Sequence, residues 1–258
     1  MGKRKKRSME VKRKKFQGVL NILSFNRHFY VIGLLVLCLI LIVCAYFEIS
    51  KILIWVISGA FLYGLVMPLI ISAYVYDFSG YYDFKWFKDL NIDEKVATQI
   101  VNINAGFDET SFTIKDKFPN SNLQVFDFYN ADKHTEPAII RARKVTNEYP
   151  NTIQINTKHI PLNDNSVDVL FLLSAIHEIR KDEEKVQFLK ECKRVCKENG
   201  KVIVVEHLRD VANFFAFSVG FTHFFSQKTW LKVFKQAVFK NVIEKKFTPF
   251  MSIFTIEK

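Results

Sequence analysis

Residues 167–179 carry the sequence VDVLFLLSAIHEI, which decides the fold. The first seven residues form a short, almost entirely apolar run, as expected for a strand that is buried on both faces of a sheet. Polar side chains, among them His177 and Glu178, follow immediately. In α/β proteins, ligands collect at the carboxyl ends of such strands. The stretch therefore predicts a central strand with a candidate site at its end.

Strand-like and helix-like stretches alternate around this run. The strand-like runs are 98–103, 123–128, 152–156, 167–173 and 201–206, and the helical stretches are about 108–117, 133–148 and 182–197. Gly200 would be the stop signal of the last helix. Alternation of this kind predicts an α/β fold with a parallel sheet that is covered on both faces. Two strand-like runs on either side of Thr248-Pro249 predict a terminal β-hairpin at the sheet edge.

Two charge-free apolar runs precede the predicted sheet. They cover residues 30–47 and 52–76, and each reaches the roughly 18 residues that indicate a membrane helix. Only Glu48 to Lys51 separate them, so we expect an antiparallel two-helix transmembrane hairpin. A cleaved signal peptide is the alternative for the first run, but no small-residue cleavage site separates it from the second.

The net charge of +11 belongs to the amino-terminal tail. Residues 1–28 hold ten Lys/Arg and one Glu, whereas residues 77–258 are nearly balanced, with 26 basic and 24 acidic residues. The positive-inside rule places the tail, and with it both termini and the large domain, in the cytoplasm. The tail could also attract anionic lipid headgroups. Because the domain offers no net positive field, we expect no nucleic-acid partner.

We expect four parts in the chain: a basic cytoplasmic tail (1–28), two transmembrane helices (29–76), an amphipathic linker (77–96) and a folded domain (97–258). The four cysteines indicate neither a disulfide framework nor a zinc site. Two of them lie inside the first apolar run, and the other two are four residues apart on a predicted helix, without a CxxC motif. We therefore expect no metal site.

Five β/α units followed by a hairpin resemble the class I S-adenosylmethionine-dependent methyltransferase family. The segment VNINAGFDE (101–109) stands at the place of the glycine-rich first motif of that family, and Asp127 ends the second strand, 21 residues after Gly106. INTKHIPLNDNSVDVLF (155–171) is similar to the segment that leads into the fourth strand, and KRVCKENGKVIVVE (193–206) to the segment of the fifth. The resemblance implies a Rossmann-like class I methyltransferase sheet and S-adenosylmethionine as cofactor.

The resemblance also implies the cofactor-binding positions. Gly106 stands at the central glycine, but asparagine and aspartate replace the two outer glycines, and an asparagine replaces the usual acidic residue of the first strand. Asp127 would accept hydrogen bonds from the ribose hydroxyls in an open crevice, and Phe128 would form a wall for the adenine. The full set is Asn102, Asn104, Gly106, Asp108, Asp127, Phe128, Asn156 and Thr157.

Methyl transfer needs a general base only if the acceptor must lose a proton. The candidates at the ends of the fourth and fifth strands are His177, Glu206 and His207. The segment NFFAFSVGFTHFF (213–225) would be a helix that is buried or rests on the bilayer, or a lining for an apolar acceptor.

The sequence therefore favours a membrane-tethered methyltransferase that uses S-adenosylmethionine. Its acceptor would be a small molecule, lipid-like or otherwise apolar or membrane-associated. The altered glycine loop favours a second hypothesis, a non-catalytic methyltransferase-like binding or scaffold module at the membrane. A nicotinamide oxidoreductase is disfavoured because the chain lacks G-x-G-x-x-G.

Overall fold

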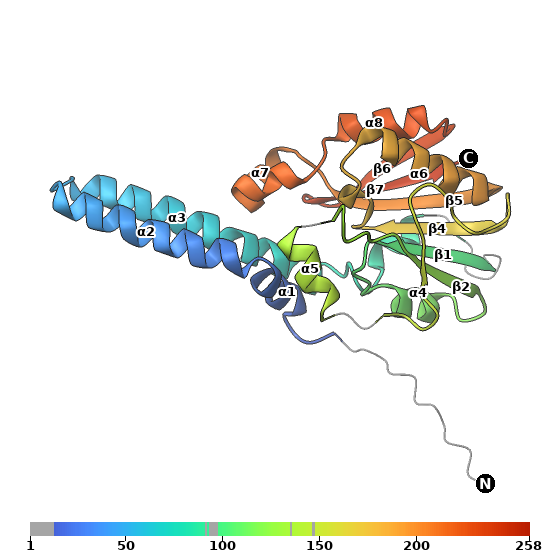
Figure 1. Cartoon of the computed structure of the whole chain (residues 1–258), viewed down its shortest axis with the longest axis horizontal. Helices are drawn as coiled ribbons and strands as arrows, with labels where there is room; N and C mark the ends of the chain where they lie inside the picture. Colours follow the sequence, from blue (N-terminus) through green and yellow to red (C-terminus); the bar gives the residue numbers. More distant parts are fainter. Residues whose placement is uncertain (1–12, 91, 93–97, 135, 146–147) are drawn as a thin grey trace, which may run out of the picture.

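A computed structural model describes residues 13–90, 92, 98–134, 136–145 and 148–258 (Figure 1). The predicted domain start at residue 97 and the first basic run of the tail lie outside the described residues. The α-helices are α1 (Gln17–Phe25), α2 (Arg27–Tyr46), α3 (Lys51–Ser72), α4 (Ser111–Lys117), α5 (Pro137–Arg143), α6 (Asp182–Val195), α7 (Val211–Phe217) and α8 (Gln227–Gln236). Shorter helical turns are η1 (Ala73–Phe78), η2 (Lys85–Asp89), η3 (Ile176–Glu178) and η4 (Ser218–His223). The strands are β1 (Gln99–Asn104), β2 (Asn122–Asp127), β3 (Ile153–Gln154), β4 (Val167–Leu173), β5 (Cys196–His207), β6 (Asn241–Thr248) and β7 (Met251–Glu257).

The strands form one seven-stranded sheet in the order β3-β2-β1-β4-β5-β7-β6. The first five are parallel, and β7 runs antiparallel to both β5 and β6. The predicted α/β sheet with a terminal hairpin at its edge is confirmed. Because the chain order reverses between β1 and β4, the ends of these two strands form the crevice where ligands of open α/β sheets bind.

Three local predictions need correction. The third strand is reduced to Ile153–Gln154, and the helix predicted over 133–148 extends only over Pro137–Arg143 among the described residues. Gly200 does not stop a helix, because α6 ends at Val195 and β5 begins at once. A Cβ atom at Gly200 would lie 2.8 Å from the carbonyl oxygen of Val167, so the glycine allows β5 to approach β4 closely.

The two faces of the sheet bury alternate residues of each strand, as the pleat requires. On β5, Val202 and Val204 face one core cluster, and Ile203 and Val205 face the other. Helices α6 and α8 cover the first face, and Figure 1 shows both on the same side of the sheet. Helix α4 and the segment after α3 cover the second face.

The segment predicted as a linker is part of this second core. Tyr81, Phe84, Trp86 and Phe87 are each at most 4% exposed and pack against Phe171 and its neighbours on the sheet. The indole N–H of Trp86 donates to the carbonyl oxygen of Tyr81 at 2.9 Å. The chain between the apolar helices and β1 therefore contributes core aromatics to the domain.

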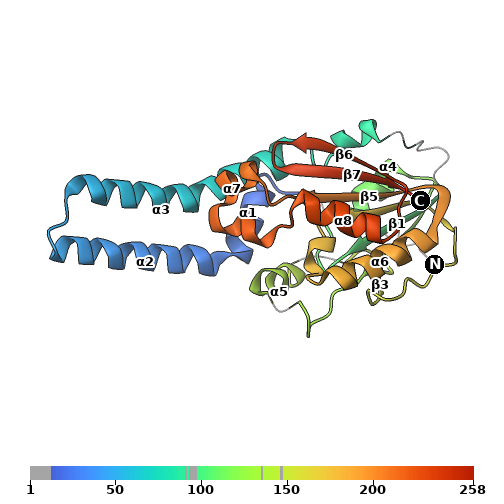
Figure 2. The same cartoon turned by 90° about the horizontal axis from the view of Figure 1, so that it is seen from above.

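Helices α2 and α3 leave the domain as a long antiparallel hairpin (Figures 1 and 2). Both are long and apolar enough to cross a membrane, by length and composition, and most of their side chains are exposed. The described part of the basic tail, from Arg13 onward, packs against the protein. Helix α1 docks at the base of the hairpin, where Arg13 pairs with Glu109 at 2.6 Å and the amide of Gly18 donates to Asp77 at 2.8 Å.

We expect Trp86→Ala to lower the free energy of unfolding by about 3–5 kcal/mol, because it leaves a cavity in the second core. Trp55→Ala is the matched control, since Trp55 lies on the apolar hairpin and is 77% exposed. Denaturant titration of both variants in detergent micelles measures the difference. Equal midpoints for the two variants would contradict the placement of the linker in the core.

Candidate cofactor cleft and histidine–glutamate cluster

The turn after β1 keeps the shape of a cofactor loop without its outer glycines. Gly106 has a φ of +89°, a conformation that glycine adopts freely. Asn104 supports this turn, because its side-chain oxygen accepts a hydrogen bond from the Gly106 amide at 2.8 Å. Asn104 is also paired in register with Asp127 on β2. The structure thus brings Asn104, Gly106 and Asp127 together at the carboxyl edge.

Asn102 and Asp108 stabilise the start of α4. The buried Asn102 amide donates to the hydroxyls of Thr110 and Ser111 at 3.2 and 2.8 Å. Asp108 accepts from the backbone amides of the same two residues, each at 2.9 Å. Asp108 therefore occupies helix amides that a glycine-rich loop leaves free for a ligand, while Asn102 holds the two hydroxyls beside them.

Asp127 does not lie in an open crevice, and this corrects the expectation. It is 4% exposed, and its carboxylate pairs with the Arg143 guanidinium at 2.6 Å. The other carboxylate oxygen accepts from the Tyr129 amide at 2.7 Å. Arg143 also lies over the Tyr129 ring, 4.2 Å from its centroid. A Cβ atom added to Gly106 would lie 2.3 Å from this guanidinium, so Arg143 covers the turn as well as the carboxylate.

The three remaining predicted cofactor residues have partners within the protein. Phe128 is 2% exposed and packs in the core, with its ring centroid 5.3 Å from that of Phe188, so it is not an open wall for an adenine. Asn156 accepts from the backbone amides of the two residues that follow Thr157. Thr157 donates its hydroxyl to Glu184 at 2.6 Å.

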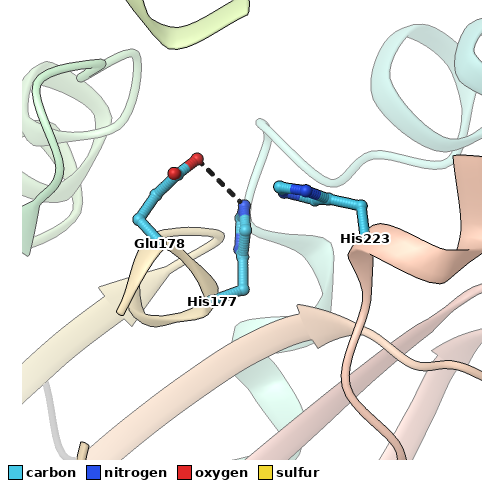
Figure 3. A group of neighbouring side chains, drawn as sticks. All are labelled: His177, Glu178 and His223. Atoms are coloured by element: carbon cyan, nitrogen blue, oxygen red, sulfur yellow. Dashed lines mark ion pairs between the residues drawn. The ribbon is translucent and has the colours of Figure 1, made fainter. Parts of the chain in front are cut away.

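A second polar group lies at the ends of β4 and β5. His177 Nδ1 lies 2.7 Å from the Glu206 carboxylate, and its Nε2 lies 3.4 Å from Glu178 (Figure 3). The His223 ring comes from η4 and stands 5.1 Å from the His177 ring, centroid to centroid. Burial alone would lower the pKa of His177, but the charges and hydrogen bonds of Glu206 and Glu178 outweigh it and raise this pKa to about 10.

His207 links three parts of the chain and has no free ring nitrogen. Its Nε2 accepts from the Tyr76 hydroxyl at 2.7 Å, and its Nδ1 donates to the Phe250 carbonyl at 2.9 Å. Its ring stacks on Phe224. Burial lowers the pKa of His207 to about 4, so the ring is neutral at physiological pH.

Sequence reasoning missed Arg143, His223 and Tyr76. Each lies far along the chain from its partner: Arg143 is on α5 beside the β2 end, Tyr76 follows α3, and His223 follows the phenylalanine-rich helix. No spacing pattern connects them, and nothing in the sequence distinguishes Arg143 from Lys133, Arg141 and Lys144 in the same connection. The single histidine of the aromatic segment 213–225 was the only signal.

Comparison with known proteins identifies the fold. Residues 123–204 match a family model described as a methyltransferase domain. PigF with SAH has a TM-score of 0.51 at 14% identity, over 74% of this chain and 58% of its own. The fold is that of a class I methyltransferase. A proposed O-methyltransferase from Nostoc punctiforme scores 0.50 at 14% identity, over 76% of this chain and 60% of its own.

A SAM-dependent methyltransferase from Aquifex aeolicus is also similar, with 17% identity and a TM-score of 0.49, over 67% of this chain and 87% of that one. No curated protein matches the chain in sequence. The chain spans about three fifths of PigF and of the Nostoc protein. The matched domain model, PigF and the Nostoc protein confirm the resemblance to the class I methyltransferase fold, and S-adenosylmethionine is the cofactor that the domain family uses.

The buried neutral His207 predicts a loss of stability in acid. The pKa of His207 is about 4 in the folded protein and 6.5 for an ordinary histidine. Between pH 6.5 and 4, this imidazole is therefore protonated in the unfolded chain but neutral in the folded one. Stability should fall as the pH falls from 6.5 toward 4, by about 2 kcal/mol between pH 7.5 and 5. Denaturant midpoints of wild type and His207→Gln across this range test this, and equal pH slopes would contradict it.

Proposed function

We propose that this protein is a membrane-tethered, S-adenosylmethionine-dependent methyltransferase with its domain and both termini in the cytoplasm. One observation carries the proposal. The Gly106 turn and the Asp127 carboxylate lie side by side at the ends of β1 and β2, within the fold of class I methyltransferases. The matched methyltransferase domain supports the same activity.

The cleft residues fit the cofactor if the Arg143 side chain moves out of the cleft. Asp127 would accept the ribose hydroxyls, and the Gly106 turn would let the ligand approach the backbone. Both positions now contact Arg143, whose side chain is 28% exposed. We propose that the guanidinium swings away when the cofactor binds and covers the buried carboxylate when it leaves. The cofactor supplies the activated methyl group, and the chain has only to hold it and exclude water.

The aromatic segment before β1 would provide the exclusion of water. Tyr82 donates its hydroxyl to Glu109, in the loop after β1, at 2.7 Å. The hydroxyl of Tyr81 lies 3.4 Å from that of Ser174, directly after β4. The segment therefore lies across the carboxyl ends of both strands that flank the crevice.

Of the three predicted catalytic residues, we propose that His177 is the one that faces the methyl acceptor. Both ring nitrogens of His207 are engaged, which favours a positioning role. Glu206 is 1% exposed and holds His177 with both carboxylate oxygens. His177 Nε2 faces Glu178 and His223 (Figure 3), so this nitrogen is the one that an acceptor could approach.

An acceptor at the membrane is supported by α7 and η4. Tyr63, in the middle of α3, donates its hydroxyl to the Phe215 carbonyl at 2.6 Å, and the views in Figures 1 and 2 both place α7 beside α3. Tyr63 precedes Ser72, the end of α3, by nine residues, or about 13 Å of helix. The exposed apolar side chains here are Val211, Phe214, Phe215 and Val219. If α3 spans the bilayer, these side chains would lie in its cytoplasmic leaflet.

Calorimetric titration with S-adenosylmethionine tests the cofactor site. Asp127→Asn should bind the cofactor about 10- to 100-fold more weakly, because an amide replaces a charged acceptor at nearly constant shape. Asp132→Asn, an exposed residue of the same connection, should bind like the wild type. Unchanged affinity in Asp127→Asn would place the site elsewhere, and a wild type that binds no cofactor would favour the scaffold alternative.

The same titration on Arg143→Ala tests whether this side chain competes with the cofactor. If the guanidinium occupies the cleft in competition with the cofactor, its removal should tighten cofactor binding several-fold while Asp127→Asn weakens it. Weaker binding in Arg143→Ala would show that this side chain holds the ligand.

An environment-sensitive fluorophore on a cysteine tests the contact of α7 with the bilayer. In a Cys38→Ser background, the label on Val219→Cys should emit at shorter wavelength in lipid vesicles than the label on Ile243→Cys. Both positions are exposed, at 80% and 61%, but Ile243 lies on the edge strand β6. Equal emission from the two labels would contradict insertion of α7.

A further inference from the structure

Two histidines and a glutamate converge beside the ends of β4 and β5. His177 and Glu178 come from η3, and His223 comes from the end of η4, 45 residues further along the chain. Their ligand atoms all lie within 4.8 Å of one another. Figure 3 shows the His223 ring pointing toward the Nε2 atom of His177, with the Glu178 carboxylate on the other side.

One of the three separations equals the distance between two ligands of a metal ion. His177 Nε2 and Glu178 Oε1 are 3.4 Å apart, whereas a charge-assisted hydrogen bond would bring them to about 2.7–2.9 Å. Ligands at about 2.0–2.2 Å from a tetrahedral zinc ion are separated by about 3.3–3.6 Å. The same separation occurs in the pairs His159–Glu191 and His223–Glu136, so the distance fits an edge of a coordination tetrahedron and an ordinary ion pair alike. What sets this group apart among the described residues is the third ligand, His223.

Outer partners hold both rings in place. His177 Nδ1 lies 2.7 Å from Glu206, the carboxylate–histidine arrangement that orients metal-binding imidazoles. His223 Nδ1 lies 3.4 Å from Glu136. Arg180 donates to the backbone carbonyls of both histidines, at 3.1 and 2.8 Å, and so fixes the two segments relative to each other.

We propose that His177, Glu178 and His223 bind a divalent transition-metal ion, with Zn²⁺ the best match to two imidazoles and one carboxylate. Three protein ligands leave a position open, as in catalytic zinc sites. An acceptor oxygen could bind there and lose its proton more readily. This last step rests on the proposed methyltransferase function, whereas binding of the ion does not.

The test uses the full-length protein in detergent, stripped with a chelator and titrated with Zn²⁺ by calorimetry and with Co²⁺ by visible absorption. We expect one ion per chain and at least 100-fold weaker binding in His223→Gln. Glu206→Gln should weaken binding about 10- to 100-fold, through the orientation of His177. His159→Gln is the matched control, because His159 also faces a glutamate at 3.4 Å, Glu191, but no third ligand group joins this pair in the part of the chain that the structure describes.

A wild type that takes up no Zn²⁺ or Co²⁺ would overturn the proposal, whatever the variants do. Unchanged affinity in His223→Gln, with its thermal unfolding intact, would overturn it as well. Titration of the stripped protein with S-adenosylmethionine is read separately, so a failure of metal binding and a failure of cofactor binding give different results.

Discussion

The hydrogen bond between Tyr76 and His207 ties the apolar hairpin to the carboxyl end of the sheet. Tyr76 lies in η1, the continuation of α3, two residues before its end at Phe78, and His207 ends β5. The same imidazole contacts Asn213 on α7 and the Phe250 carbonyl before β7. Both ring nitrogens of His207 make hydrogen bonds, and moving the buried ring would leave a polar group without a partner and without water. The ring is therefore held in one position. The hairpin, α7 and the sheet therefore hold fixed places relative to one another.

The Tyr76–His207 contact determines which segments of the chain lie at the carboxyl edge of the sheet. The aromatic segment that follows Tyr76 turns back over the ends of β1 and β4, and α7 stays beside α3. One end of the domain is thus occupied by the apolar hairpin and its neighbouring helix, and the crevice lies under aromatic cover. The segment that follows Tyr76 therefore covers the ends of these strands and also supplies core packing through Trp86.

The candidate cofactor cleft illustrates how a chain with a substituted motif keeps the fold. Asparagine and aspartate stand where flexible glycines are usual, and their side chains satisfy the backbone amides of the turn and of α4. The loop gains rigidity from these bonds, and Arg143 neutralises the Asp127 carboxylate, which would otherwise be buried without a charged partner. The Arg143 guanidinium thus occupies the space beside Asp127 and Gly106, because α5 lies against the end of β2.

The sequence by itself determined the sheet, its terminal hairpin, the two apolar helices and the position of Asp127 at the end of β2. These follow from local periodicity and from the rule that consecutive β/α units build a parallel sheet. Only the tertiary structure decided that Arg143 covers Asp127, that Phe128 is a core residue, and that His223 joins His177 and Glu178. Each of these depends on where segments distant in the chain come to rest, and hydrophobic patterns specify which residues are buried without specifying which polar side chains meet.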